Sequence, residues 1–449
     1  MRLGKYEKYA KTTIPGLEQV PASWTVARIK DIILKIGSGV TPKGGSEVYV
    51  SSGIPFLRSQ NIYDEGLWIE DVSFITEEIN EKMKNSQIRP KDIVINITGA
   101  SIGRSCIIPD TLKKANINQH ILFFRFGSNK VAYIEKFLKS NYIKEYIMSV
   151  QSGTSKEALT MRQALNFPIL VPPDIEQFRI VDFLNKRTAS IDKKISLLNS
   201  KIVQYQDLKK ALINETVCRG LNDNVRFKKS NIEWVKEIPS HWVVKRLKDV
   251  GYLYSGLSGK SGEHFNQDFN GKSRYYIPFT NIANNKYINH EDLSTVIMED
   301  DERQNRVQKN DLFFLMSSEG YEDIGKTSLL IEDVKETYLN SFCKGYRITS
   351  KDIVPKYLNY LLSSISFRDR LIVEGKGFTR INLKMEKVSD FNFIVPSVSE
   401  QIEIAKYLDS KTKTLDNIIS NVILQVETLK ELRKTLINDL VLGKFKVIA

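Results

Sequence analysis

The segment Gly320–Thr327 reads GYEDIGKT and fits the pattern of a phosphate-binding loop, whose backbone amides wrap around phosphate. Such a loop needs a strand before it and a helix after it. The residues that follow, Ser328–Ile331, are instead typical of a strand, and three acidic residues in and beside the loop would repel a triphosphate. We interpret this segment as a hairpin turn before a strand. A nucleotide-dependent protein that uses residues 320–327 remains an alternative.

Other catalytic patterns are missing. Adenine methyltransferases hold a flipped base with Asn or Asp followed by Pro-Pro and an aromatic residue, and the nearest string, Val171–Asp174, has neither end of this motif. The three cysteines and four histidines show no metal-ligand spacing, and Cys106 and Cys343 lie in apolar runs typical of buried side chains. Asp92 and Asp311 each stand at the start of an apolar run, where a turn role is favoured. We expect no catalytic residue, metal site or cofactor site in this chain.

Several loops combine Lys or Arg with Gly, Ser, Asn or Gln. Cations hold phosphates, whereas amides and guanidinium groups read base edges, so these loops are candidates for nucleic-acid contact. The candidates in the first half are Lys43, Arg58, Ser59, Gln60, Asn61, Arg104, Lys156 and Arg162. The candidates in the second half are Lys260, Lys272, Arg274, Tyr275, Asn281, Lys326, Lys376 and Arg380. Any single one of them also fits an ordinary solvated residue, but the repeat favours the matched loops.

The sequence contains an internal repeat whose period is about half the chain. Ile14–Ile32 aligns with Ile232–Val250, which places Trp24 opposite Trp242 in amphipathic runs typical of core anchors. Further matched positions follow in the same order in both halves: Ile54-Pro55-Phe56 with Ile277-Pro278-Phe279, Asp92 with Asp311, Gly103 with Gly325, and Asn118 with Asn340. Each copy mixes short β-branched and aromatic runs with Gly, Asn, Pro and Ser, and helical patterns cover Ala132–Ser149 and Pro355–Arg370. This mixture of strand and helix patterns predicts an α/β (α+β) domain in each half.

A span nearly free of Gly and Pro follows each domain, at Ile175–Arg219 and Ser399–Leu442, and predicts a long helix. Asp174 and Ser399 are the expected N-caps. Apolar residues recur in both spans at steps of four, three, four, three, three and four residues, which would be a helix-pairing seam with a shared overwound step. The predicted seam residues are Ile191, Ile195, Leu198, Ile202, Tyr205, Leu208 and Leu212, with Leu415, Ile419, Val422, Val426, Leu429, Leu432 and Leu436.

Two long helices in tandem bury such seams most simply as an antiparallel coiled coil. This pairing predicts two domains related by a pseudo-twofold axis at opposite ends of a rod. A seam of about 25 residues is roughly 40 Å long at about 1.5 Å per residue, comparable with one turn of B-DNA at about 34 Å. We therefore expect the rod to act as a spacer.

The composition agrees with a globular protein of more than one domain. The chain has 449 residues, of which 41% are hydrophobic and 10% aromatic, and its net charge of +13 favours a polyanionic partner. It has no apolar run that would serve as a secretion signal or span a bilayer, so we expect a cytoplasmic protein. A coiled-coil adaptor that binds only protein, with the charge serving solubility, is a further alternative.

The two openings that end in Trp24 and Trp242, the Ile-Pro-Phe boxes, the Asp92 and Asp311 runs and the helix starts containing Glu176-Gln177 and Glu400-Gln401 occur in one order, twice. In these features the chain resembles the specificity (S) subunits of type I restriction-modification systems over nearly its full length. The resemblance implies target-recognition domains at 1–172 and 222–396 and conserved helical regions at 173–221 and 397–449.

The resemblance also implies that each recognition domain reads one half of a bipartite, asymmetric site in double-stranded DNA, without catalysis by this chain. The implied partners are two methyltransferase subunits, which use S-adenosylmethionine, and two restriction/motor subunits, which use ATP and Mg²⁺. The halves differ most at Lys43–Asn61 against Lys260–Asn281 and at Gln151–Asn166 against Glu374–Val388. We expect these segments to make the two half-sites different.

Overall fold

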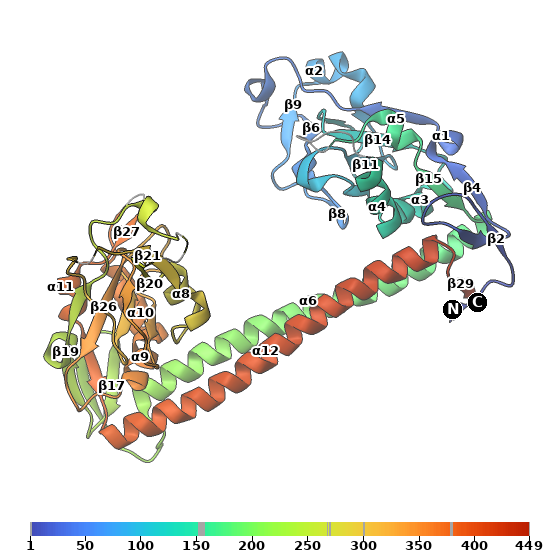
Figure 1. Ribbon diagram of the computed structural model, residues 1–449. Helices are drawn as coiled ribbons and strands as arrows, with labels where there is room; N and C mark the ends of the chain where they lie inside the picture. The colour runs from blue at the N-terminus through green and yellow to red at the C-terminus, as the bar shows by residue number, and fades with distance from the viewer. Residues whose placement is uncertain are drawn as a thin grey trace. The chain divides into compact units, whose positions relative to one another are not determined.

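The computed structural model describes residues 2–150, 158–266, 268, 271–299, 301–377 and 380–448. The chain divides into two compact units. Unit 1 contains Met1–Asn199 and Leu424–Ala449, and unit 2 contains Ser200–Ile423. Each unit therefore includes one globular domain and parts of both long helices (Figure 1).

A four-stranded antiparallel sheet lies at the centre of each domain. In unit 1 its order is β12 (Ser105–Ile107), β11 (Ile93–Asn96), β14 (Ile121–Arg125) and β5 (Lys35–Ser38). In unit 2 the order is β24 (Thr327–Leu329), β22 (Leu312–Leu315), β26 (Cys343–Ile348) and β19 (Gly251–Ser255). The middle strands β11 and β22 are buried along their whole length, which explains their continuous apolar sequence. The matching order confirms the predicted repeat and the mixed fold class.

A second sheet in each domain also has matching strands. In unit 1 its order is β10 (Gln87–Ile88), β13 (Ala115–Ile117), β6 (Ile54–Leu57) and β9 (Ser73–Ile75), and in unit 2 it is β25 (Thr337–Leu339), β20 (Ser273–Ile277) and β21 (Ser294–Ile297). In both units an inner strand of this sheet, β6 or β20, pairs in parallel with the strand that precedes the matched asparagine. The predicted match of the two Ile-Pro-Phe boxes is wrong by three residues. β6 contains all of the first box, whereas β20 ends at Ile277, which takes the place of Leu57, and Phe279 begins a helix. A two-stranded sheet then leads into each long helix, formed by β4 (Thr25–Arg28) with β15 (Pro168–Val171) and by β18 (Val243–Arg246) with β28 (Asn392–Val395).

The shorter helical patterns each form two helices instead of one. Residues 132–149 become α3 (Val131–Leu138) and α4 (Asn141–Val150), and residues 355–370 become α9 (Pro355–Ser363) and α10 (Ile365–Val373). A buried serine stands at each break: Ser140 Oγ accepts from the Ile143 amide at 3.4 Å, and Ser364 Oγ donates to the Leu361 carbonyl at 2.6 Å. Serine side chains compete with the backbone for helical hydrogen bonds. The spacing of apolar residues does not predict the resulting break.

The long helices are confirmed as α6 (Asp174–Arg219) and α12 (Val398–Val441), which lie side by side in Figure 1. They run antiparallel, because Asp192 of α6 pairs with Arg433 of α12 at 2.9 Å in unit 1, whereas Lys209 pairs with Asp416 at 2.6 Å in unit 2. The expected N-caps are both wrong, because α6 already includes Asp174 and α12 already includes Ser399. Ser397 caps α12 instead: its Oγ accepts from the Glu400 amide at 3.3 Å, and the Glu400 carboxylate accepts from the Ser397 amide at 3.4 Å.

The overwound step predicted for the seam is also wrong. Leu208 and Leu432 are 53% and 52% exposed, while the other twelve predicted seam residues are buried or half-buried. The next residues, Lys209 and Arg433, are half-buried and take the seam positions, so the four-three alternation continues without a defect. Their aliphatic stems lie along the seam while their charged ends reach the aspartates of the other helix.

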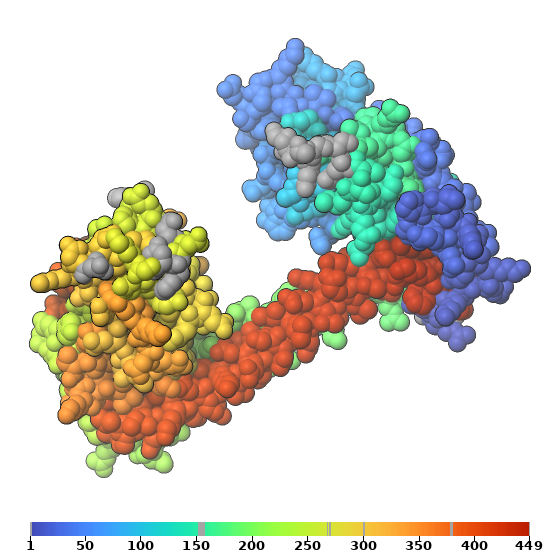
Figure 2. All heavy atoms as spheres, in the orientation of Figure 1, coloured from blue at the N-terminus to red at the C-terminus, as the bar shows by residue number. Residues whose placement is uncertain are grey.

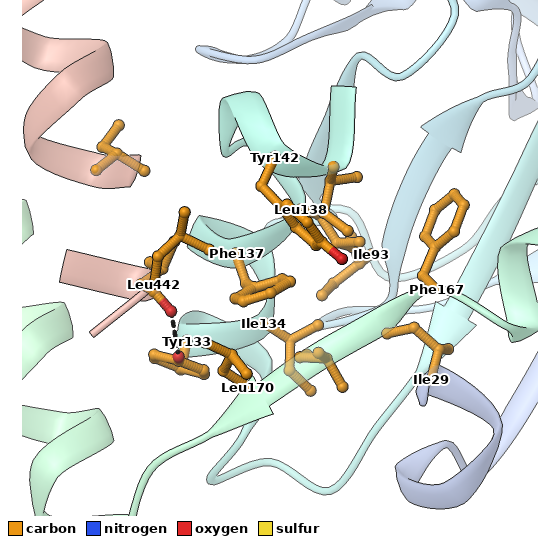
Figure 3. Close-up of a cluster of buried hydrophobic side chains, with 14 of the residues drawn as sticks. Ile29, Ile93, Tyr133, Ile134, Phe137, Leu138, Tyr142, Phe167, Leu170 and Leu442 are labelled. Atoms are coloured by element: carbon orange, nitrogen blue, oxygen red, sulfur yellow. Dashed lines mark hydrogen bonds between the residues drawn. The ribbon is translucent and has the colours of Figure 1, made fainter. Parts of the chain in front are cut away.

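Each domain core includes the start of one long helix and the end of the other. In unit 1, Ile180 and Leu184 of α6 share a cluster with Leu440 and Val441 of α12. Figure 3 shows this core, in which the buried Tyr133 hydroxyl donates to the Val441 carbonyl at 3.1 Å. In unit 2 the equivalent core combines Val217 of α6 with residues of α12, among them Leu408. The domains are therefore held to the helix pair by continuous apolar packing.

The two matched tryptophans join the helix ends, which confirms their predicted role as core anchors. Trp24 is buried in unit 1, where its indole N–H donates to Glu176 at the start of α6 at 3.1 Å. Its ring lies against Gly443, just after α12, which has a positive φ of 70° and no room for a side chain. Trp242 repeats both contacts in unit 2, with Glu400 at 3.2 Å and Gly220 after α6.

The first and last strands of the chain pair with each other in unit 1. β1 (Arg2–Gly4) is antiparallel to β29 (Lys446–Ile448), and the Tyr9 hydroxyl donates to the Lys444 carbonyl at 3.3 Å. The red C-terminal residues accordingly lie against the dark blue N-terminal residues in Figure 2. In unit 2 a continuous hairpin, β16 (Phe227–Ile232) with β17 (Val235–Pro239), follows the end of α6.

Candidate nucleic-acid interface

The loop 320–327 is a turn, as interpreted from the sequence. Thr327 begins strand β24, so a strand and not a helix follows the loop. Lys326 Nζ donates to Asp323 Oδ1 at 2.6 Å and to the Ala283 carbonyl at 3.1 Å. The lysine that a phosphate-binding loop would need is therefore bound within the domain, which also reduces its availability for DNA.

The aspartates before the central strands have structural partners. Asp92 receives the Arg125 guanidinium at 2.6 Å and the Arg89 amide at 2.9 Å. Asp311 receives Arg347 at 2.7 Å and the Gln308 amide at 2.8 Å in the matching turn. These contacts confirm the turn role predicted for both residues.

The cysteines are poorly suited to nucleophilic chemistry. Burial raises the pKa of Cys106, Cys218 and Cys343 to about 12 in each case. A thiol with such a pKa is almost entirely protonated near neutral pH. Among the described residues, no group of His, Cys, Asp and Glu is arranged to hold a metal ion.

Two of the predicted DNA contacts are wrong. Asn61 and Asn281 are 0% and 1% exposed, so neither reaches a base. Their side chains close matched turns instead: Asn61 Nδ2 donates to the Trp68 carbonyl at 2.9 Å, and Asn281 Nδ2 donates to the Asn289 carbonyl at 2.8 Å. The asparagines are repeated because the turn is repeated.

Several predicted cations of unit 2 are held in ion pairs within the domain. Lys260 pairs with Glu302 at 2.6 Å, Lys272 with Glu299 at 2.5 Å and Arg274 with Glu336 at 2.9 Å. The Lys260 side chain is only 2% exposed, so its charge is the least accessible of the three. Contact with phosphate would have to compete with these carboxylates.

The remaining described candidates of both units are exposed or half-buried. Lys43, Gln60 and Arg162 are exposed, and the Arg104 guanidinium lies 5.0 Å from the centroid of the Tyr63 ring. Arg58 donates to the Asp71 carbonyl at 3.1 Å, and the Ser59 carbonyl accepts from Asn96 Nδ2 at 2.8 Å. Lys376, Arg380 and Tyr275 are exposed in unit 2. Lys156 lies outside the described residues.

Sequence reasoning missed a pair of turns that lie among these loops. We define the tip turns as residues 118–120, between β13 and β14, and residues 340–342, between β25 and β26. Each packs against the Gly-Ser loop of its domain, which spans residues 37–45 in unit 1 and 254–262 in unit 2, at Gly39 or Gly256. Their exposed residues, Gln119, Ser341 and Phe342, were not among the candidates. The sequence does carry a signal for these turns. Asn118 and Asn340 match between the two copies, whereas the two residues that follow each asparagine differ.

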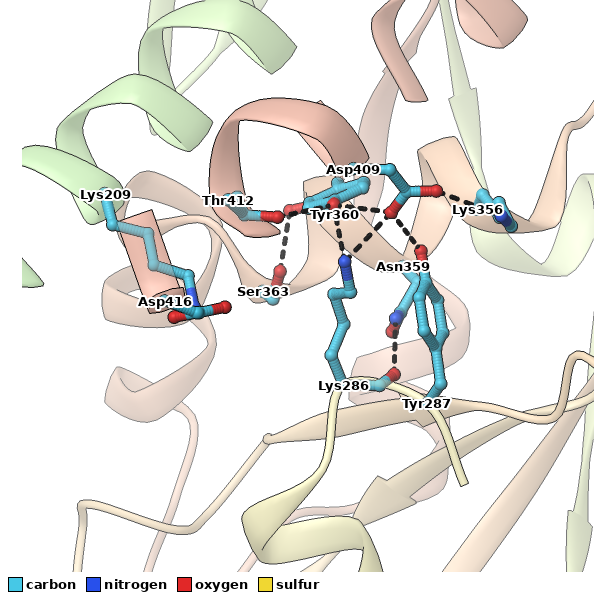
Figure 4. A network of polar contacts seen from close by, with 10 residues as sticks. All are labelled: Lys209, Lys286, Tyr287, Lys356, Asn359, Tyr360, Ser363, Asp409, Thr412 and Asp416. Carbon is cyan, nitrogen blue, oxygen red and sulfur yellow. Dashed lines mark hydrogen bonds and ion pairs between the residues drawn. The ribbon is translucent and has the colours of Figure 1, made fainter. Parts of the chain in front are cut away.

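A polar network in unit 2 binds the globular domain to α12 (Figure 4). Asp409 Oδ1 accepts from Lys286 Nζ at 2.9 Å, the Tyr287 hydroxyl at 2.6 Å and the Tyr360 hydroxyl at 2.7 Å. Asp409 Oδ2 accepts from Lys356 Nζ at 2.9 Å. Burial pushes the pKa of Asp409 up, but these four donors outweigh burial and hold the pKa well below its usual range.

These features define a class of protein with two copies of one α+β domain on an antiparallel helix pair. The Type I restriction modification DNA specificity domain family matches the chain twice, at residues 21–201 and 239–428. The chain belongs to this family, and it is a DNA-recognition subunit. No helix among the described residues is long and apolar enough to cross a membrane.

Individual relatives agree with this assignment. The chain is 24% identical to a putative type I restriction enzyme specificity subunit, MjaX, of Methanocaldococcus jannaschii, over 99% of this chain and 98% of the relative. It is similar in fold to a chain from a type I R-M system studied for complex assembly and conformational transition, with a TM-score of 0.72, 15% identity and coverage of 94% and 98%. It is also similar to the HsdS subunit from Thermoanaerobacter tengcongensis, with a TM-score of 0.54, 16% identity and coverage of 95% and 99%.

Proposed function

We propose that each recognition domain reads one half of a bipartite, asymmetric DNA sequence. The supporting observation is that the two domains have the same strand order, and the same parallel pairing beside the tip turn, but different side chains in the loops around it. A common scaffold with different exposed groups suits two different half-sites. Residues 1–172 and 222–396 would then be the two target-recognition domains.

The long helices would set the number of base pairs between the half-sites. Both are uninterrupted, over 46 residues in α6 and 44 in α12, and packing along their seam resists bending. The family assignment supports partners of two kinds: two adenine methyltransferase subunits, and two restriction/motor subunits in the complete complex. S-adenosylmethionine, ATP and Mg²⁺ would bind to those subunits, and this chain would act on DNA in the cytoplasm without catalysis of its own.

The test is to co-express the chain with a cognate methyltransferase subunit and map N6-methyladenine across the host DNA by single-molecule sequencing. We expect a bipartite motif that disappears when this chain is omitted. Exchanging residues 222–396 for those of a relative should change one half of the motif and leave the other half unchanged. An unchanged motif after the exchange would contradict the assignment of half-sites to domains.

A protein-only adaptor makes a different prediction for binding. If several cations contact phosphates, the affinity of the assembled complex for DNA should fall steeply as salt rises, because condensed counterions are released on binding. We expect about a tenfold or greater loss between 50 and 200 mM salt. Binding that does not respond to salt would argue against the phosphate contacts.

A further inference from the structure

The backbone of the two tip turns is the same in both units. The amide of Asn118 donates to the Leu57 carbonyl at 3.0 Å, and that of Asn340 donates to the Ile277 carbonyl at 3.1 Å. In each turn the asparagine Oδ1 accepts from the amide two residues later, at 3.2 Å from His120 and 2.9 Å from Phe342. These bonds fix where the next two side chains emerge.

A glycine in each unit locks the turn in place. Gly39 and Gly256 approach so closely that a Cβ on either would collide with the carbonyl of Asn118 or Asn340. Both glycines lie in the Gly-Ser loops that contain the candidates Lys43 and Lys260. The close approach holds the turn and the loop together as one rigid surface.

The side chains that this common backbone presents differ between the two units. In each unit, contacts with neighbouring residues hold them in place. In unit 1, Gln119 hydrogen-bonds to the Thr41 hydroxyl and, at 3.1 Å, to His120 Nε2. The other ring nitrogen of His120 lies 2.8 Å from Thr98 Oγ1. In unit 2, Phe342 is 48% exposed, and the Arg380 guanidinium lies 4.7 Å from its ring centroid. These contacts order each set of side chains on the surface of its turn.

The two sets have different recognition chemistry. A glutamine amide offers a donor and an acceptor that match the adenine edge in the major groove. A phenyl ring contacts a thymine methyl group, and an adjacent arginine pairs with guanine O6 and N7. Side chains that are already ordered lose less entropy on binding.

We propose that the tip turns determine base specificity: Gln119, positioned by His120 and Thr41, reads a base edge in one half-site, and Phe342 with Arg380 reads the other. This inference rests on the proposed assignment of one half-site to each domain. It adds the residues that make the half-sites different. Asn118, Asn340 and the two glycines are positioning residues that serve both readings.

The experiment measures the methylated motif for Gln119→Ala and Phe342→Ala in the complex with the methyltransferase. We expect each variant to lose roughly ten- to hundredfold discrimination at a base pair of one half-site, the two variants affecting opposite halves. The matched control is Tyr252→Ala, because Tyr252 is a 49% exposed aromatic residue that pairs with Arg347 at the far end of β19. The control should leave the motif unchanged.

A second variant keeps the test informative if an alanine variant fails to fold. Ser341→Gln with Phe342→His places the unit 1 pair on the unit 2 turn, and we expect the preferred base at one position of that half-site to change. Thermal unfolding of each complex verifies that the variants are assembled. Assembled complexes whose motif matches the wild type, or whose methylation falls equally at all sites, would overturn the proposal.

The outcome also separates this inference from the proposed function. If the wild-type complex gives a bipartite motif and exchange of residues 222–396 changes one half, the proposed function stands whatever the tip variants do. If the wild type gives no bipartite motif, the assignment of half-sites itself fails.

Discussion

Replacing Asp409 with alanine removes the carboxylate on which Lys286, Tyr287, Lys356 and Tyr360 converge. Two donors come from the loop after α8 (Phe279–Asn284) and two from α9, whereas Asp409 belongs to α12. The substitution therefore weakens the polar attachment of the second recognition domain to the helix pair. We expect local destabilisation of this attachment without unfolding of the domain core.

The magnitude follows from the exposure of the four donors. The Lys286 and Lys356 side chains are 34% and 45% exposed, so both ammonium groups can turn to water and their loss costs little. The hydroxyls of Tyr287 and Tyr360 are part-buried and lose an ionised acceptor, which costs about 1 to 1.5 kcal/mol each. We expect the free energy of local opening to fall by about 2 to 3 kcal/mol.

Hydrogen exchange measured by mass spectrometry tests this value on the full chain. A loss of about 2 kcal/mol predicts roughly thirtyfold faster exchange for amides of α9 that open locally. The matched control is Asn185→Ala, because Asn185 holds the equivalent place in the first repeat and is exposed. Exchange less than about threefold faster for Asp409→Ala, or equal acceleration by both variants, would refute the reasoning.

The pH dependence gives a second measurement. Because the pKa of Asp409 is lowered in the folded protein, its contribution is present above the unfolded value of about 3.9 and is lost as pH falls through the folded pKa. The difference in exchange between wild type and Asp409→Asn should therefore be constant from about pH 8 to pH 5. It should shrink only below about pH 4.

Three further predictions concern the helices and the turn. Trp242→Ala should destabilise unit 2 by about 3 to 5 kcal/mol, measured by urea unfolding, because it empties a fully buried site and removes the bond to Glu400. Leu415→Ala should cost about 2 kcal/mol and Leu208→Ala less than about 1 kcal/mol by the same measurement, because Leu415 is buried in the seam and Leu208 is exposed; equal losses would contradict the corrected seam. Lys326→Ala should leave the thermal stability of the chain insensitive to added ATP, as in the wild type; stabilisation of the wild type by ATP that the variant loses would revive the nucleotide-dependent alternative.

The repeat made most of the fold predictable. The apolar runs after Asp92 and Asp311 became the matched strands β11 and β22, and the long spans without Gly and Pro became α6 and α12. The seam prediction is wrong at Leu208 because apolar character alone does not mark a buried position. Lys209 occupies that position, since a long side chain buries its stem and still reaches Asp416.

The candidate site was less predictable, because residue type does not reveal a partner distant in sequence. Lys260 is a candidate phosphate ligand by residue type, but its side chain is buried against Glu302, 42 residues away. Asn61 and Asn281 are candidate base contacts because they are polar and repeated, but here the repetition marks a buried turn. The tip turns depend on Gly39 meeting Asn118 across two sheets, which no local pattern records.

The asymmetry at Asp409 bears on how the two halves act. The Trp-to-Glu bond is repeated in both units, so the anchoring of each domain at the helix ends is common to them. The four-donor network is built around Asp409 in unit 2, whereas the first repeat has an exposed asparagine, Asn185, at that place. A neutral, solvated amide cannot replace an ionised acceptor for two ammonium groups and two hydroxyls. If half-site spacing depends on how firmly each domain is attached, Asp409→Ala should relax the spacer requirement of the methylated motif, and Asn185→Ala should leave that requirement unchanged.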